Sequence, residues 1–170
     1  MPNRIDIVLF SRNRIEYARQ SISYILARTR TPYRLHVIDD SSTDGTVDYL
    51  LSLWREGKIC DLILRGRNAG ITANYNLANW LSFSDPFVIT ADDLLCPDVE
   101  PDWLSRGVEM MQRRPDLGEL DLNNPGAYRV SYQHDGDVVY CEAVGGTFGF
   151  IRRALVPHIC LSHFINNFDQ

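Results

Sequence analysis

The first part of the chain alternates between two hydrophobic patterns. Short apolar runs typical of buried strands occur four times, at residues 5–11, 33–39, 60–65 and 86–92. Apolar residues at spacings of three and four, which predict amphipathic helices, follow these runs at residues 15–28, 47–54, 71–81 and 102–113. Strands that alternate with helices imply right-handed crossovers and a mostly parallel sheet flanked by helices.

The pattern changes after Gly118. Residues 128–146 alternate apolar and polar positions around Asp135 and Gly136, which predicts a β-hairpin. A further apolar run at 147–151 and a helical stretch from Ala154 follow. We therefore expect a single α/β domain over residues 1–170, with a parallel portion at 1–117 and an antiparallel C-terminal portion at 118–170.

Composition narrows the class of protein. The formal net charge is −5, which argues against nucleic-acid binding but leaves room for one anionic ligand held by a few local donors. No apolar run approaches the ~18 residues of a transmembrane helix, and no signal peptide is evident. We expect a cytoplasmic protein that can lie peripheral to a membrane.

The four cysteines form no C-x-x-C pair, so their spacing indicates neither a zinc site nor a disulfide scaffold. Reduced thiols are the expected state. The cysteines are Cys60, Cys96, Cys141 and Cys160.

Four polar stretches fall at the predicted carboxyl ends of the strands, where open α/β sheets bind ligands. They are "SRNR" at 11–14, "DDSSTDGT" at 39–46, "RGRNAG" at 65–70 and "ADD" at 91–93. If the strands are parallel, all four stretches line one edge of the sheet. Neither a G-x-G-x-x-G nor a P-loop motif occurs among them, which argues against a dinucleotide or P-loop site.

The acids in these stretches have two interpretations. Asp44 and Gly45 can form a turn that caps the helix beginning near Thr46, but this leaves the adjacent Asp39 and Asp40 unexplained. Carboxylates in that place can accept hydrogen bonds from a ribose hydroxyl or a base imide.

The stretches at 65–70 and 91–93 also have a structural and a functional interpretation. Asp92 and Asp93 either cap a turn or bind Mn²⁺ or Mg²⁺ together with phosphate oxygens. Arg65 and Arg67 can bind a phosphate or carboxylate, and Gly70 permits close backbone approach. The alternative is an ordinary surface loop that enters a helix.

In this order, the stretches resemble a family 2 glycosyltransferase of the GT-A fold. Residues 10–14 correspond to the family's P-T-x-N-R, and residues 38–46 nearly reproduce its V-D-D-G-S-T-D-G-T. Residues 90–93 stand at its D-x-D or D-D-D metal motif. Other matches are Asn68, Gly70, Ala73 and Asn76 of its N-x-G…A…N segment, and Gly145, Gly146, Arg152 and Arg153 of its G-G…R-R segment.

The resemblance implies an inverting transfer of sugar from a nucleotide-diphosphate donor, UDP-type by expectation, to a hydroxyl of an unknown glycan, lipid or protein. It implies Mn²⁺ or Mg²⁺ bound by Asp93 and Asp92. It also divides the chain into a nucleotide-sugar-binding half at 1–117 and a short acceptor-side portion at 118–170, which we expect to be truncated. The implied donor-binding residues are Ser11, Asn13, Asp39, Asp40, Arg65, Arg67, Asn68, Gly70 and Asp92.

The catalytic base stays unassigned. In this family it follows an F-D or W-D pair, and Phe168-Asp169 resembles that pair just before Gln170. Asp169 and Glu142 are the nearest acids in sequence that could replace the missing base, and neither is assigned. His158 and His163 are expected to be partly buried helix residues. The alternative function is a non-catalytic nucleotide-sugar-binding module; a nucleotidyltransferase is disfavoured because residues 11–14 lack a glycine-rich loop. An oligomer is possible at an open sheet edge.

Overall fold

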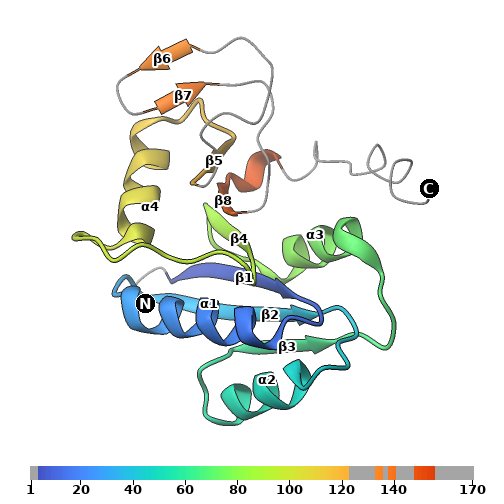
Figure 1. Ribbon diagram of the computed structural model, residues 1–170. Helices are drawn as coiled ribbons and strands as arrows, with labels where there is room; N and C mark the ends of the chain where they lie inside the picture. The colour runs from blue at the N-terminus through green and yellow to red at the C-terminus, as the bar shows by residue number, and fades with distance from the viewer. Residues whose placement is uncertain (1–3, 123–132, 136–137, 141–147, 156–170) are drawn as a thin grey trace.

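The computed structural model describes residues 4–122, 133–135, 138–140 and 148–155. These residues form a six-stranded sheet with helices on both faces, and a separate two-stranded hairpin (Figure 1). The strands are β1 (Ile5–Ser11), β2 (Tyr33–Asp39), β3 (Asp61–Leu64), β4 (Phe87–Ala91), β5 (Glu119–Asp121), β6 (Gln133–Asp135), β7 (Val138–Tyr140) and β8 (Phe148–Ile151). The helices are α1 (Ile15–Arg28), α2 (Thr46–Arg55), α3 (Gly70–Leu81), α4 (Trp103–Arg113) and the 3₁₀ helix η1 (Arg153–Leu155).

The main sheet has the strand order β3-β2-β1-β4-β8-β5. The first four strands are parallel, whereas β8 runs antiparallel to both β4 and β5. This is the predicted α/β architecture with an antiparallel C-terminal portion. Because β1 and β4 are central and parallel, their carboxyl ends and that of β2 meet at one edge of the sheet.

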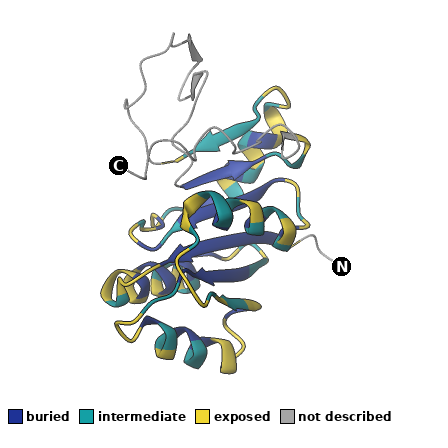
Figure 2. Cartoon of the chain, turned by 90° about the vertical axis from the view of Figure 1, so that its right-hand side faces the viewer, coloured by how far each residue is buried: buried dark blue, intermediate teal, exposed yellow. Residues whose placement is uncertain are grey.

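Helices cover the two faces unequally. Buried side chains of α1, α2 and α4 pack on one face, against residues such as Leu9, Val37 and Phe150. Helix α3 packs on the other face, where Ala78 contacts a cluster that includes Phe10 and Ile89. Figure 2 shows the central strands as the most buried layer. All seven residues of β1 are buried, which is why its sequence is an almost unbroken apolar run.

The predicted strands and helices of residues 5–113 are confirmed with small shifts at their ends, as in the third strand, which spans 61–64 rather than 60–65. The hairpin is confirmed by the antiparallel pairing of β6 with β7. Strand β5 was not predicted, because only Leu120 of its three residues joins the core. The predicted C-terminal helix begins in η1, and its remaining residues lie outside the described part of the chain.

No helix in the described part of the chain has both the length and the apolar character needed to cross a bilayer.

Helix α4 approaches the sheet closely at Gly107. A Cβ atom at this position would lie 2.0 Å from Cζ of Phe150, whose side chain is fully buried. We predict that Gly107→Ala lowers the free energy of unfolding by about 1–3 kcal/mol through overpacking, despite a helix-propensity gain of up to about 1 kcal/mol. Urea unfolding measures the change. Gly66→Ala is the control, since no atom lies within 4 Å of its Cβ position; equal losses at both sites would contradict the packing argument.

The turn after β2 contains a strained residue. Ser41 has a φ of 68°, in the left-handed region that costs a non-glycine residue about 1–2 kcal/mol. We predict that Ser41→Gly raises the free energy of unfolding by about 0.5–1 kcal/mol, because glycine removes the strain but adds entropy to the unfolded chain. The control, Ser52→Gly within α2, is expected to lower it by a similar amount. A loss of stability in Ser41→Gly would show that the serine side chain outweighs the strain.

Candidate functional site

The loops after β1 and β2 are joined by hydrogen bonds. Asn13 adopts a φ of 50°, and its Oδ1 accepts a hydrogen bond from the N–H of Thr43 at 2.7 Å. The N–H of Asn13 donates to Oγ of Ser42 at 2.8 Å. The first two of the four polar stretches therefore form one structural unit, in which Asn13 orients the backbone.

Asp44 ties the same two loops to the helices that follow them. Its Oδ1 accepts hydrogen bonds from the N–H and hydroxyl of Thr46 at the start of α2, at 3.1 and 2.6 Å. Its Oδ2 accepts from the N–H of Ile15, the first residue of α1, at 3.0 Å. The hydrogen bond from Thr46 is the main cause that lowers the pKa of Asp44. The N-cap position of α2 is Gly45, and Asp44 just before it bonds the first N–H group of α2 as well as that of α1.

The adjacent acids at the end of β2 are both buried and both hydrogen-bonded. Asp39 accepts from the N–H and the hydroxyl of Ser42, at 2.8 and 2.5 Å. Asp40 points to the start of α3, where its two oxygens accept from the N–H groups of Ala69 and Gly70 at 2.8 and 3.1 Å. Separate sets of donors thus stabilise the two neighbouring charges. Each carboxylate oxygen retains capacity for a further donor, so contact with a nucleobase stays a prediction.

The segment before α3 is built around these contacts. Asn68 Oδ1 accepts from the N–H of Gly70 at 3.0 Å, and Gly70 has a φ of 79°. The guanidinium of Arg65 donates to the carbonyl of Ala73 at 3.0 Å, and its buried Nε lies 3.9 Å from Asp40. Arg65 therefore supports the helix start, whereas Arg67 is exposed on the same loop.

Asp92 follows β4 and is held against β1. Its N–H donates to the carbonyl of Phe10 at 3.1 Å, and its Oδ2 accepts the hydroxyl of Ser11 at 2.7 Å. The carboxylate is nearly inaccessible, with 4% of the side chain exposed. Burial raises the pKa of Asp92, although the hydrogen bond from Ser11 acts in the opposite direction. The serine predicted to lie near the donor thus orients a predicted metal ligand.

Arg14 lies between the two predicted metal ligands. Its Nη1 is 2.5 Å from Oδ2 of Asp93 and 3.7 Å from Oδ1 of Asp92. Asp93 is 44% exposed, so one carboxylate is buried and the other open to solvent. Both oxygens converge on a single cationic nitrogen, which marks a position where a cation is stable. The two carboxylates therefore fit a hard divalent ion that completes its shell with waters and phosphate oxygens.

A connected set of contacts runs from the start of α3 to Asp93. Asp40 bonds α3, its N–H donates to the carbonyl of Ser11 at 2.9 Å, and Ser11 bonds Asp92. The four polar stretches thus lie at one edge of the sheet, as predicted. The predicted residues on this edge are Ser11, Asn13, Asp39, Asp40, Arg65, Arg67, Asn68, Gly70, Asp92 and Asp93. Arg14 was not predicted as a site residue, although it ends the motif over residues 10–14.

The C-terminal arginines have packing roles in the described structure. The guanidinium of Arg152 donates to the carbonyls of Leu117 and Met111, which fastens β8 to the end of α4. That of Arg153 donates to the carbonyl of Ser82 after α3. Other residues singled out from the sequence lie outside the described part: Glu142, Gly145, Gly146, His158, His163, Phe168 and Asp169.

Known structures share this fold at low sequence identity. A mannosyltransferase from Pyrobaculum calidifontis, in complex with GDP-Man and Mn²⁺, aligns with a TM-score of 0.69 and 18% identity, over 92% of this chain and 46% of that one. TarS from S. aureus (residues 1–349), in complex with UDP-GlcNAc, aligns with a TM-score of 0.67 and 15% identity, over 92% and 47%. The chain thus spans about half the length of these structures.

A search of curated protein sequences found no match. The sequence model of glycosyl transferase family 2, in contrast, matches residues 6–154. This range includes the whole main sheet except Ile5, and all ten residues predicted to bind donor or metal. The fold is that of the GT-A glycosyltransferases. The chain belongs to glycosyltransferase family 2.

Proposed function

We propose that this chain acts as an inverting glycosyltransferase, and that residues 1–117 bind a nucleotide-diphosphate sugar together with a divalent cation. The observation that carries the proposal is the convergence of Asp92 and Asp93 on one cationic nitrogen. Both acids belong to the set of contacts that includes the predicted nucleotide-binding residues. A cation at this position would stabilise the diphosphate that leaves the sugar.

The start of α3 supports a metal-dependent site. The amino end of a helix can bind phosphate through its free N–H groups. Here Asp40 accepts hydrogen bonds from the N–H groups of Ala69 and Gly70, and its negative charge faces the positive end of the helix dipole. The diphosphate charge must therefore be neutralised elsewhere. The candidates are the cation at Asp92 and Asp93 and the exposed guanidinium of Arg67.

The nucleobase is proposed to contact Asp39 and Asp40, with Ser11 and Asn13 beside it. UDP is the expected nucleotide, although the structural relatives bind either GDP-Man or UDP-GlcNAc. The acceptor is proposed to supply a hydroxyl group, whose proton passes to a carboxylate that stays unassigned.

Calorimetry with UDP and with GDP, each in Mn²⁺ and in EDTA, tests the proposal. We expect UDP to bind in Mn²⁺ and to lose at least about tenfold in affinity, or about 1.4 kcal/mol, when EDTA removes the metal. Asp93→Asn is expected to abolish this difference, whereas the control Asp48→Asn, exposed in the first turn of α2, is expected to retain it. Absence of binding by either nucleotide would overturn the proposal. Binding without sugar hydrolysis or transfer would identify the non-catalytic module instead.

The position of Arg14 predicts that its substitution strengthens Mn²⁺ binding but weakens UDP binding. Because its guanidinium occupies the cation position, we expect Arg14→Gln to bind Mn²⁺ alone about two- to fivefold more tightly, as a partly exposed ion pair contributes about 0.2–1 kcal/mol. The same substitution is expected to weaken UDP binding in saturating Mn²⁺, because the displaced arginine is then free to pair with phosphate. Electron paramagnetic resonance measures free Mn²⁺, and calorimetry measures UDP.

Arg12→Gln is the matched control, since Arg12 is an exposed neighbour on the same loop. Unchanged Mn²⁺ affinity in Arg14→Gln would show that the arginine does not compete with the metal.

A further inference from the structure

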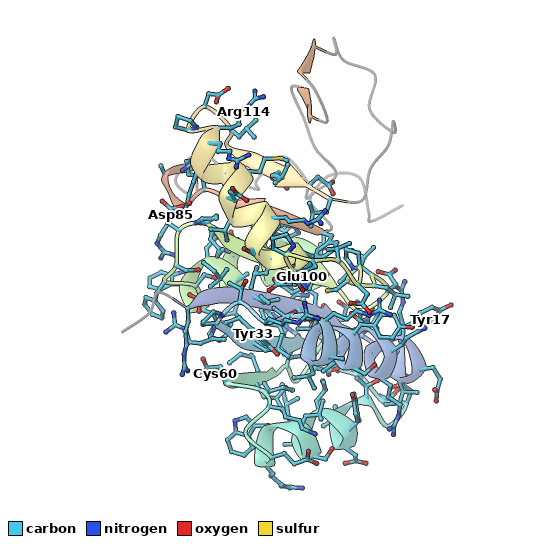
Figure 3. All side chains as sticks on the ribbon, turned by 90° about the vertical axis from the view of Figure 1, so that its left-hand side faces the viewer. Tyr17, Tyr33, Cys60, Asp85, Glu100 and Arg114 are labelled. Carbon is cyan, nitrogen blue, oxygen red and sulfur yellow. The ribbon has the colours of Figure 1, made fainter. Side chains whose placement is uncertain are left out.

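A second polar cluster lies at the opposite end of the sheet from the donor site. Asp6 is near the amino end of β1 and Asp61 begins β3, and the pairing of β2 with β3 sets His36 directly opposite Asp61. In Figure 3, Cys60 lies far from Tyr17, which stands in the first turn of α1 close to the donor-side loops. The cluster is therefore separate from the set of contacts that joins Asp40 to Asp93.

Three different ligand atoms converge in this cluster. The Nδ1 atom of His36 lies 2.8 Å from Oδ2 of Asp61, and the ligand atoms of His36, Cys60 and Asp61 all lie within 4.8 Å of one another. In a tetrahedral zinc site, bonds of about 2.0–2.3 Å place ligand atoms roughly 3.5 Å apart. The longest of these separations must therefore shorten by at most about 1.3 Å, and the distance from Nδ1 to Oδ2 must lengthen by about 0.7 Å. Cys60 is exposed and Asp61 is 52% exposed, so both side chains have room to rotate.

A buried carboxylate orients the histidine. Asp6 is fully buried, and its Oδ1 lies 3.1 Å from Nε2 of His36. It is also held by two guanidinium nitrogens of Arg34, at 2.6 and 2.9 Å, and by the N–H groups of Phe83 and Ser84. Although burial alone raises it, the hydrogen bonds from His36 and Arg34 hold the pKa of Asp6 well below its usual range. The ionised Asp6 favours the tautomer with hydrogen on Nε2, which leaves the Nδ1 lone pair directed at Asp61.

A positive species at Nδ1 would satisfy this geometry. A neutral imidazole donates a hydrogen bond through one nitrogen only. The lone pair of its other nitrogen would then face a lone pair of a carboxylate oxygen, and the two would repel each other. Either a proton or a metal ion removes this repulsion. With a proton, the imidazolium and Arg34 balance Asp6 and Asp61. With a divalent ion and the Cys60 thiolate, the ion and Arg34 balance three anions, so the net charge is the same.

We propose that His36 Nδ1, Cys60 Sγ and Asp61 form a zinc-binding site, with Asp6 orienting the histidine and the fourth position open to solvent. A mixed nitrogen, sulfur and oxygen donor set suits a borderline ion such as Zn²⁺ better than Mg²⁺ or Ca²⁺. Burial, with Asp61 nearby, raises the pKa of the Cys60 thiol. Zinc must therefore displace a proton from the thiol, so binding strengthens as the pH rises.

Cobalt and zinc titrations of the full chain test the proposal. We expect Co²⁺ to produce a near-ultraviolet thiolate-to-cobalt charge-transfer band, which Zn²⁺ then displaces. Calorimetry of Zn²⁺ binding in buffers of different ionisation enthalpy is expected to show proton release from the Cys60 thiol. Cys60→Ser is expected to abolish the band, and Asp61→Asn to weaken Zn²⁺ binding at least about tenfold.

Asp93→Asn is the matched control, because it alters the donor site and leaves the cluster intact. It is expected to retain both the band and the zinc affinity, so the two sites are tested independently. A charge-transfer band that survives in Cys60→Ser would assign the thiolate to another cysteine and overturn the proposal. Absence of any band in the natural chain would overturn it as well, and would identify the cluster as a proton-balanced ion network.

Discussion

The candidate donor site depends on the hydrogen bonds of Asp40. Its side chain accepts from the amino end of α3, and its backbone N–H donates to the carbonyl of Ser11 at the end of β1. A buried carboxylate needs donors, and the helix amino end needs acceptors, so each removes the other's desolvation cost. Because Ser11 in turn bonds Asp92, the positions of the base-side and metal-side acids are mechanically linked.

This linkage divides the acids of the site by role. Asp39, Asp40 and Asp44 are engaged by protein donors and shape the loops. Asp92 also accepts the hydroxyl of Ser11, but its charge and that of Asp93 are balanced by Arg14, which is half exposed. Arg14 is therefore the partner that solvent or a ligand can replace most readily. The exchangeable partner therefore lies at the end of β4, whereas hydrogen bonds hold the loops after β1 and β2 in place. A preorganised nucleotide site with an exchangeable cation requires both.

The sequence predicted the parallel part of the sheet well because β1, β2 and β4 are largely buried on both faces, whereas the helices are buried on one. Those burial patterns give distinct periods, as in β1 and α1. Strand β5 escaped prediction because Glu119 and Asp121 flank a single apolar residue, and such a short strand depends on its pairing with β8. Among site residues, motif order indicated the common edge, but the side chain of Arg14 could be placed only from the structure. The sequence also could not show that Asp39 and Asp40 are already hydrogen-bonded within the protein, because most of their partners are backbone N–H groups.

The second polar cluster, at the amino end of the sheet, shows more clearly what the sequence alone does not predict. Cysteine spacing indicated no zinc site, because spacing detects ligands that are neighbours in sequence. His36 meets Cys60 and Asp61 only through the register between β2 and β3. The two ends of the sheet thus hold carboxylates under opposite conditions. At the carboxyl end, oxygen donors stand near solvent with an exchangeable arginine. At the amino end, Arg34 is committed to Asp6, and the nitrogen and sulfur donors beside it suit a softer ion. Donor type and the commitment of the neighbouring arginine, rather than the number of acids, therefore distinguish the ions proposed for the two ends.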